Sequence, residues 1–434
     1  MSGLRCCDSE LFDVGFTVPG FIERSKAIAS LPSLGLLTLA GMTPDEHTIE
    51  YWEVDDMPTG DELPDGFDLV AISSFTARIL DAYALADQFR QRGTTVVLGG
   101  LHVTVLPDEA SEHADCVVIG EGEAVWNEIL DDAAAGNLRP RYSSFARPNF
   151  DLANAPMPAF ELLDISKYNR LTVQTTRGCP LKCEFCAASI LLTPHYKQKP
   201  VAKVLAEIDS ICELWPRPFI EFADDNSFIN RGYWKELLPE LKKRRVKWFT
   251  ETDLSVHKDD ELLRLMRDSG CAQVLIGLES PVEAGLSGIE LRNDRKIKWL
   301  PDYLDAIKRI QSHGIRVNGC FVLGLDGHTP EIFDQVYDFA MESELYDVQI
   351  TYQTPFPGTP LYDRLLKEDR LLHLGEWDRC TLLDVNFQPS GMTVDQLRNG
   401  FHDLSKRLYS DELTQWRRDN FKQKYLRARK HRSA

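Results

Sequence analysis

The sequence predicts an α/β protein in three parts: a doubly wound parallel sheet, a partial barrel of six β/α units, and a small, mainly helical C-terminal subdomain. Short, apolar, β-branched segments alternate with helical stretches through most of the chain, a pattern typical of parallel sheets covered on both faces. The alternation stops once, in a stretch with several prolines that is typical of a linker. The expected division is 1–140 for the first sheet, 141–168 for the linker, 169–365 for the barrel and 366–434 for the C-terminal subdomain.

The strand candidates of the first sheet are rich in Val, Ile and aromatic residues. They are 11–16, 48–54, 69–75, 95–101 and 116–122. Helical stretches such as ILDAYALADQFRQRG (79–93) separate them, as a series of β/α units requires.

Polar residues and glycines follow three of these strands. They are Ser73, Ser74 and Thr76, then Gly99 and Gly100, then Gly120 and Glu121. Ligands of open parallel sheets bind beyond the carboxyl ends of the strands, and small residues there let a large, flat group approach the backbone. Tight strand-to-helix turns explain the glycines equally well. These residues are the candidate ligand-binding edge of the first sheet.

The second alternation has longer units. Its strand candidates are 171–176, 219–223, 247–252, 273–278, 316–323 and 347–352, and its helical stretches include 201–214, 233–243, 259–268, 300–313 and 331–343. Six units are fewer than the eight of a complete barrel, which takes about 250 residues. An open, partial barrel is therefore expected, with its chemistry at the carboxyl ends of the strands.

Composition excludes some classes of function. The chain has 434 residues, a net charge of −18 and a hydrophobic share of 43%, so we expect a folded protein that binds no nucleic acid. Two local basic stretches, 241–247 and 415–434, are expected to be solvated helix faces. No apolar run reaches the roughly 20 residues of a membrane helix, and no signal peptide is recognised. We therefore expect a cytoplasmic protein with no integral membrane segment.

Three cysteines are concentrated in RGCPLKCEFC (177–186), directly after the first barrel strand. Cys179, Cys183 and Cys186 lack the fourth ligand of a structural zinc site and have one thiol more than a redox pair needs. They best suit a cluster of four irons in which one iron has no protein ligand and is left for an external one. The scattered cysteines are expected to be small core residues: Cys6, Cys7, Cys116, Cys212, Cys271, Cys320 and Cys380.

The triad, with aromatic Phe185 before its last cysteine, resembles the radical S-adenosylmethionine superfamily. The resemblance implies a 4Fe-4S cluster whose open iron binds the amino and carboxylate groups of S-adenosylmethionine. The reduced cluster then cleaves S-adenosylmethionine to a 5′-deoxyadenosyl radical, which abstracts hydrogen from the substrate. Arg177 and Lys182 would add positive charge beside the anionic cluster, and Phe185 would pack on the adenine side.

Segments after the later barrel strands match the same family in order and spacing. FADDNSF (222–228) has Asp224 and Asp225 where the family holds the methionyl amine, although Asp-Asp-Asn is equally good helix-capping chemistry. The other contacts that the resemblance implies are Glu251 in FTETDLS for ribose or substrate, Glu279 in IGLES for S-adenosylmethionine, and Gly324 in GCFVLGLDG for the strand along the adenine.

The N-terminal half resembles the cobalamin-binding domain that precedes the barrel in one branch of this superfamily. The resemblance lies in SLPSLGLLTLAG, VVLGGLHVTVLPDEA and ADCVVIGEGE, and it implies that the ligand-binding edge of the first sheet holds cobalamin. The Asp-x-His-x-x-Gly motif that places a histidine on cobalt is absent from DVGFTVPGFIE (13–23). Because members of the branch also lack this motif, cobalamin without a protein histidine and an empty domain both stay open.

The branch contains carbon methylases and an anaerobic cyclase of chlorophyll synthesis. The resemblance implies cobalamin-dependent methylation of an unactivated carbon in a small-molecule substrate, with a one-electron reductant such as flavodoxin or ferredoxin as partner. Radical cyclisation, C–C bond formation or rearrangement is the alternative within enzymes. A non-catalytic metal-binding protein with a structural cysteine triad is the alternative from another class.

Overall fold

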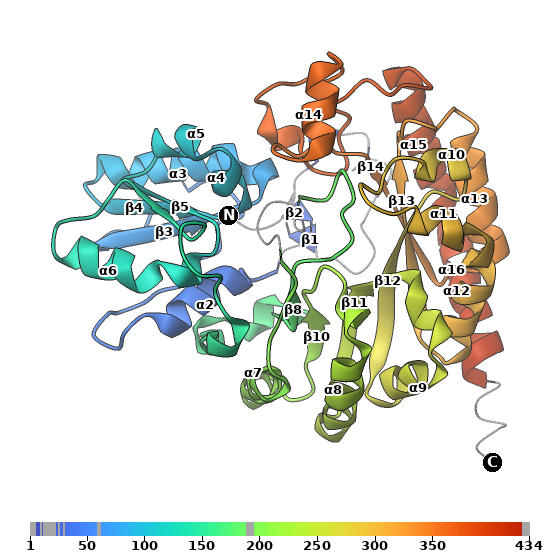
Figure 1. Ribbon diagram of the computed structural model, residues 1–434, viewed down its shortest axis with the longest axis horizontal. Coiled ribbons are helices and arrows are strands. Elements are labelled where there is room, and N and C mark those ends of the chain that lie inside the picture. Colours follow the sequence, from blue (N-terminus) through green and yellow to red (C-terminus); the bar gives the residue numbers. More distant parts are fainter. Residues whose placement is uncertain are drawn as a thin grey trace.

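The computed structural model has two α/β units side by side and a helical C-terminal segment that contacts both (Figure 1). It describes residues 6–8, 11, 23–24, 27–28, 31–58, 62–187 and 195–427. The predicted fold class is confirmed, because each unit is built on a parallel sheet and the C-terminal end is helical. Within the described residues, no helix is both long and apolar enough to span a lipid bilayer.

The N-terminal sheet is parallel and keeps its strands in sequence order. The strands are β3 (Leu69–Ser73), β4 (Thr95–Gly99), β5 (Cys116–Ile119) and β6 (Arg141–Ser143). Successive residues of β4 point to opposite faces, so Val96 and Leu98 join one apolar cluster while Val97 joins the other. The first face is covered by α3 (Ile79–Gln91), α4 (Leu101–Val105) and α5 (Pro107–Ser111), and the second by α2 (Leu34–Met42) and α6 (Trp126–Ala134) (Figure 1).

The second unit is the predicted partial barrel of six parallel strands. In spatial order they are β14 (Asp347–Tyr352), β13 (Arg316–Leu323), β12 (Cys271–Glu279), β11 (Lys247–Thr252), β10 (Phe219–Phe222) and β7 (Leu171–Val173). The outer helices are α7 (Val201–Leu214), α8 (Arg231–Arg244), α9 (Asp260–Asp268), α12 (Tyr303–Ser312) and α13 (Ile332–Ser343), with short α10 (Glu283–Leu286) and α11 (Arg295–Trp299) after β12.

Alternation along the barrel strands separates a helix-covered face from an interior face. Trp248 of β11 is fully buried and stacks on Trp234 of α8, with ring centroids 6.0 Å apart. Its neighbours Phe249 and Glu251, which point the opposite way, face the barrel interior. Only the residues of β11 that share the face of Phe249 and Glu251 can therefore contact a ligand inside the barrel.

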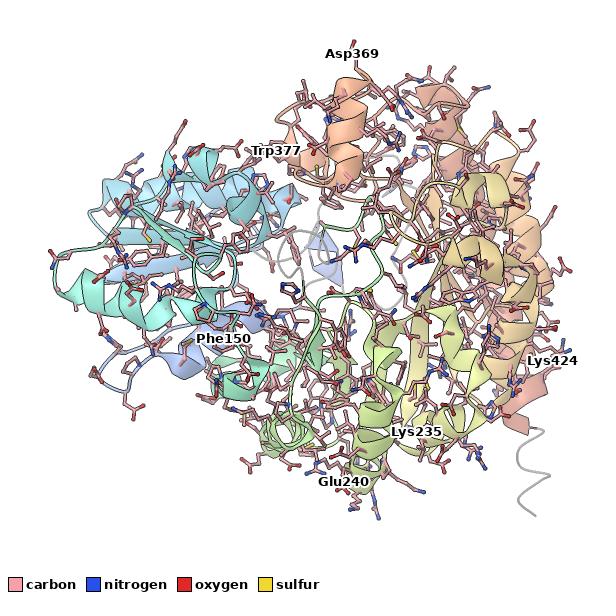
Figure 2. All side chains as sticks on the ribbon, in the orientation of Figure 1. Phe150, Lys235, Glu240, Asp369, Trp377 and Lys424 are labelled. Carbon is pink, nitrogen blue, oxygen red and sulfur yellow. The ribbon has the colours of Figure 1, made fainter. Side chains whose placement is uncertain are left out.

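The C-terminal segment joins the two units. It consists of α14 (Pro360–Lys367), a short 3-10 helix (Trp377–Arg379), α15 (Val394–Leu408), α16 (Asp411–Phe421) and a π-helical turn (Lys422–Arg427). Phe401 of α15 stacks on Tyr352 of β14 with centroids 4.1 Å apart, so α15 covers the last barrel strand. Trp377 lies at the N-terminal unit (Figure 2), and its Nε1 donates to the Glu109 carboxylate at 3.1 Å.

Two expectations about the first unit need correction. No strand forms at 48–54, because Tyr51 packs against the barrel core whereas Val54 packs against the N-terminal core. A segment that crosses between two cores cannot pair along one sheet edge. The second correction concerns the predicted linker, 141–168, because its first residues form β6 and pair with β5 in the sheet. The predicted strand at 11–16 lies outside the described residues apart from Leu11.

Candidate functional site

The cysteine motif occupies the loop between two short antiparallel strands, β8 (Thr176–Arg177) and β9 (Lys197–Gln198), just after β7. Cys179, Cys183 and Cys186 are all partly buried. The amide of Cys186 donates to the carbonyl of Cys183 at 3.1 Å, so these two cysteines share one turn. Cys183 also forms an isolated antiparallel bridge with Glu290, which ties the motif to the segment after β12.

The three thiols fit an iron–sulfur cluster better than a single ion. In the described part of the chain, no three His, Cys, Asp or Glu side chains are placed to share one metal ion. Zinc would need its thiolates about 2.3 Å from one centre, whereas the cysteines of a 4Fe-4S cluster bind different irons and stand farther apart. Burial raises the pKa of Cys179 to about 11 and that of Cys183 to about 12, and the Cys186 thiolate adds to both shifts. With pKa values this high the thiols are protonated, so iron must displace protons to bind there.

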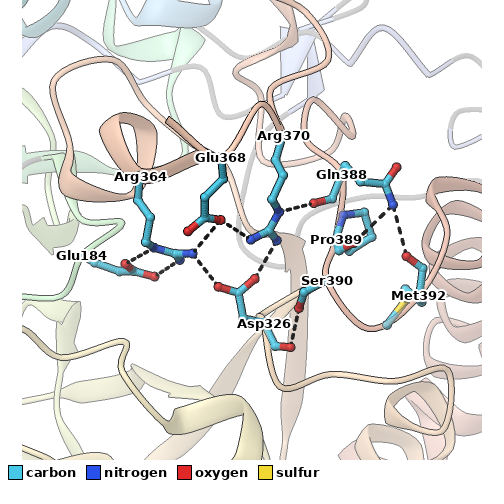
Figure 3. Close-up of polar contacts among 9 residues, drawn as sticks. All are labelled: Glu184, Asp326, Arg364, Glu368, Arg370, Gln388, Pro389, Ser390 and Met392. Carbon is cyan, nitrogen blue, oxygen red and sulfur yellow. Dashed lines mark hydrogen bonds and ion pairs between the residues drawn. The ribbon is translucent and has the colours of Figure 1, made fainter. Parts of the chain in front are cut away.

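Glu184, between the second and third cysteines, is held by Arg364 of α14 (Figure 3). Arg364 donates from Nε to Oε2 of Glu184 at 3.1 Å and from Nη2 to Oε1 at 2.7 Å. Arg364 also binds Asp326, and the second oxygen of Asp326 binds Arg370 at 2.6 Å. The amide of Leu361 donates to the Glu184 carbonyl at 3.1 Å. The bidentate contact between Arg364 and Glu184 thus fastens the cysteine motif to the C-terminal segment.

Replacing Arg364 by Gln should loosen the motif and lower cluster retention about 10-fold, as for other groups that orient metal ligands. Iron and sulfide content after anaerobic reconstitution and chelator challenge, with the EPR intensity of the reduced cluster, measures the loss. Arg309→Gln is the matched control, because Arg309 makes the same bidentate contact with Asp260, at 3.1 and 2.7 Å, on the outer helices. Equal iron retention in the two variants would contradict the role of Arg364.

The two aspartates after β10 have different surroundings. Asp224 is 3% exposed, and its carboxylate accepts hydrogen bonds from the amides of Thr175 at 2.7 Å and Thr176 at 2.9 Å. It therefore orders the chain beyond β7. Asp225 accepts from the amide of Gly178 at 3.0 Å, directly before the first cysteine. Burial raises the pKa of both aspartates. In the described chain neither carboxylate caps a following helix, so the capping explanation does not hold.

Glu251 of β11 faces the barrel interior, where solvent reaches it. Desolvation by the surrounding protein and the charges of Glu221, Asp225 and Glu279 raise its pKa to about 8. A raised pKa favours the protonated form of the carboxyl, which can donate a hydrogen bond. The structure thus brings Glu251, Asp225 and Glu279 into one region, as the predicted site requires.

Glu279 ends β12 in a left-handed backbone conformation with φ of 62°, at an irregularity in the ladder with β13. Nζ of Lys296 donates to Oε1 of Glu279 at 3.0 Å and to the carbonyl of Gly277 at 2.6 Å. A Cβ at Gly277 would lie 2.4 Å from that carboxylate oxygen, so any side chain there would displace the Glu279 carboxylate. Desolvation lowers the pKa of Lys296, but the charges of Glu279 and Cys183 outweigh it and raise the pKa. A buried ion pair therefore lies beside the second cysteine.

Phe185 and Gly324 both pack against the protein's own core. Phe185 is partly buried on the barrel core. Gly324 has φ of 90°, and a Cβ there would lie 2.8 Å from the ring of Phe387 and 3.0 Å from Leu397. Packing of the C-terminal segment therefore demands glycine at 324, independently of the adenine contact that the resemblance implies.

A cavity of about 330 Å³ lies between the two units. From the N-terminal unit it is lined by Ser73, Gly99, Gly100, Gly120, Glu121, Gly122, Glu123, Trp126 and by residues of α2. From the barrel side it is lined by Gln174, Arg177, Lys199, Ala223 and Asp225. Arg177 lies two residues before Cys179, and Asp225 accepts a hydrogen bond from the amide of Gly178. The cavity therefore extends from the binding edge of the first sheet to the cysteine motif.

Two residues predicted for this edge lie elsewhere. Ser74 does not line the cavity, and its Oγ donates to the carbonyl of Phe75 at 3.1 Å. Thr76 is buried at the start of a 3-10 helix. The cavity is also lined by Trp126 and by residues of α2, which were not predicted from the sequence because their side chains are mostly apolar. The run SLPSLGLLTLAG, which contains most of α2, pointed to this segment only through its resemblance to the cobalamin-binding domain.

The cavity lining is suited to cobalamin without a side-chain ligand on cobalt. Among the described residues that line it, none is His, Cys or Met. His102, which follows the glycine pair, turns away: its ring lies 5.2 Å from that of Trp377, and its Nε2 is 3.2 Å from Glu109. Glycines at the opposing edge let a flat ring system approach the backbone.

Comparisons with known proteins agree with this geometry. Family models match residues 173–340 as the Radical SAM superfamily, 29–130 as a B12 binding domain and 359–434 as a domain of unknown function. The chain is 30% identical over 370 residues to bacteriochlorophyllide d C-12(1)-methyltransferase of Chlorobaculum tepidum, covering 83% of this chain and 80% of that protein. It is 25% identical over 369 residues to anaerobic magnesium-protoporphyrin IX monomethyl ester cyclase of Cereibacter sphaeroides, covering 76% and 58%.

The fold is shared with a solved structure, that of the radical S-adenosylmethionine methyltransferase TsrM from Kitasatospora setae with cobalamin and a 4Fe-4S cluster bound. The TM-score is 0.57 at 17% identity, over 69% of this chain and 64% of that one. The cysteine motif fits a 4Fe-4S cluster with S-adenosylmethionine, and the cavity fits cobalamin, the cofactors that the two matched domains imply. The chain therefore belongs to the radical SAM superfamily of enzymes, in the branch with a B12 binding domain before the barrel.

Proposed function

We propose that the enzyme methylates an unactivated carbon of a small-molecule substrate in a cobalamin-dependent reaction. The cavity is the observation that carries this proposal, because a group held at Gly99 and Gly100 faces Arg177 and Asp225 beside the cysteine motif. When bound, the cluster and S-adenosylmethionine supply one-electron chemistry and cobalamin supplies the methyl group. The Chlorobaculum relative is by name a methyltransferase, which supports the same reaction class.

Apart from Ser74 and Thr76, which lie away from the cavity, each candidate residue has a role in this proposal. The iron ligands are Cys179, Cys183 and Cys186. S-adenosylmethionine is surrounded by Phe185, Asp225, Glu251, Glu279 and Gly324. Asp224 orders the chain just after β7. Cobalamin is held by Ser73, Gly99, Gly100, Gly120 and Glu121. The protein's contribution is to orient these groups.

A one-electron reductant such as flavodoxin or ferredoxin completes the proposal, because reduction of the cluster starts the reaction. Such reductants work in the cytoplasm, and we place the enzyme there.

The test is anaerobic purification and reconstitution with iron, sulfide and hydroxocobalamin, followed by incubation with dithionite and S-adenosylmethionine bearing a CD3 group. We expect 5′-deoxyadenosine, S-adenosylhomocysteine, and a corrinoid that carries the CD3 group by mass spectrometry. Protein that binds no hydroxocobalamin, or forms no S-adenosylhomocysteine, would refute methyl transfer.

Radical cyclisation, C–C bond formation or rearrangement is the second candidate. The Cereibacter relative is by name a cyclase, which supports this reaction class. In that case the same incubation yields 5′-deoxyadenosine without S-adenosylhomocysteine.

A further inference from the structure

The loop that carries the three cysteines has a cation at each end. Arg177 of β8 and Lys197 of β9 stand opposite each other in the antiparallel register. All three cysteines lie between them in sequence. Whatever holds Arg177 and Lys197 therefore holds both ends of the cysteine loop.

Two glutamates of the B12 binding domain hold both cations. Nη1 of Arg177 donates to Oε1 of Glu121 at 2.8 Å, and Nη2 donates to Oε1 of Glu123 at 2.7 Å. Lys197 pairs with the second oxygen of Glu121. We call Glu121, Glu123, Arg177 and Lys197 the charge clamp. Its formal charges cancel, and it is the contact through which the N-terminal unit grips the loop.

The side chains of the clamp are largely buried, and the turn that carries its two glutamates is held by local contacts. The side chains of Glu121 and Glu123 are each 9% exposed, that of Lys197 is 11% exposed and that of Arg177 20%. The turn that carries the glutamates is set by Gly120, whose φ is 86° and whose Cβ would lie 2.2 Å from Oγ of Ser144. That same Oγ accepts a hydrogen bond from the amide of Glu121 at 2.9 Å. Removing one partner from such a buried ion pair leaves an unpaired charge, which is strongly unfavourable.

The clamp also forms part of the cavity wall. Glu121, Glu123 and Arg177 all line the 330 Å³ space between the two units. An occupant of that cavity therefore packs on the clamp and excludes water from it, which strengthens its ion pairs. Filling the cavity should favour the clamped arrangement of the cysteine loop.

We propose that the charge clamp couples the two cofactor sites, so that cobalamin in the cavity orders the cysteine loop and an iron cluster in the loop tightens cobalamin binding. The two effects must be equal in free energy because coupling between two binding sites is reciprocal. This inference rests on the proposed cobalamin dependence, but it assigns Glu121 and Glu123 as positioning residues for a cluster bound by another domain.

The experiment measures the affinity of the full-length protein for hydroxocobalamin, by equilibrium dialysis under argon, with and without the reconstituted cluster. We expect the cluster to tighten binding about tenfold in the wild type. In Glu121→Gln and Glu123→Gln the ratio should fall toward one. Glu128→Gln is the matched control, because Glu128 pairs with Arg139 and Arg147 on the same domain and does not touch the loop. It should keep the wild-type ratio.

Hydrogen exchange of residues 178–187 supplies a second reading. Hydroxocobalamin should slow exchange there in iron-free wild-type protein and in Glu128→Gln, and have little effect in the two clamp variants. A wild-type ratio near one, or a tenfold ratio that persists in both clamp variants, would overturn the coupling while leaving methylation intact. Failure of hydroxocobalamin to bind at all would overturn the coupling together with the proposed function.

Discussion

Replacing Cys183 by Ala should abolish the cluster and lower the rate of 5′-deoxyadenosine formation by more than about 10³-fold. Cys183 is tied to the segment after β12 by its bridge with Glu290, and it shares a turn with Cys186. Two thiols cannot replace three as ligands to separate irons. The measurements are iron and sulfide content, the EPR spectrum of dithionite-reduced protein, and product formation from S-adenosylmethionine.

Cys212→Ala provides the comparison, since Cys212 is a partly buried free thiol on α7 outside the motif. It should keep both the cluster and the activity. A Cys183→Ala protein with full iron content and wild-type turnover would show that the motif does not hold the cluster.

The second large effect is expected from Lys296→Met, which should lower the free energy of unfolding by about 3 kcal/mol. Lys296 and Glu279 are each about one-tenth exposed at the side chain, so the variant leaves a buried carboxylate without its partner beside Cys183. The Gly277 carbonyl also loses its donor. The midpoint of urea unfolding under argon, followed by tryptophan fluorescence, measures the change.

Lys243→Met is the control for this prediction. Lys243 pairs with Glu240 at 2.6 Å, but its side chain is 69% exposed, and exposed pairs contribute about 0–1 kcal/mol. The double variant Lys296→Met with Glu279→Gln should recover part of the loss, because no charge is then left unpaired. Equal unfolding midpoints for Lys296→Met and Lys243→Met would contradict the importance of the buried pair.

Much of the barrel could be predicted from sequence because its signals are local. Each barrel strand is a short apolar run whose side chains alternate between helices and interior, and all six predicted strands appear in the structure. The cysteine motif is equally local, since its three ligands lie within residues 179–186 and their spacing alone indicates three ligands rather than four. Segment 48–54 has the same composition as a strand, but it bridges two cores and forms none.

The tertiary structure decided which of two adjacent carboxylates faces the cavity. Asp224 and Asp225 are equivalent in the sequence, yet successive side chains near a strand end point to opposite sides. Asp224 is therefore enclosed against Thr175 and Thr176, whereas Asp225 lines the cavity. Ser74 and Thr76 similarly follow the right strand but point away from the ligand space.

The sequence by itself determined the fold class, the six barrel strands and the three-thiol motif, because each depends on residues close together in the chain. Only the tertiary structure decided that Glu121 and Glu123 grip Arg177 and Lys197. These partners lie more than fifty residues apart and on different domains. Their meeting depends on how the two sheets pack against each other, and that packing is a sum over many weak contacts that no local pattern contains.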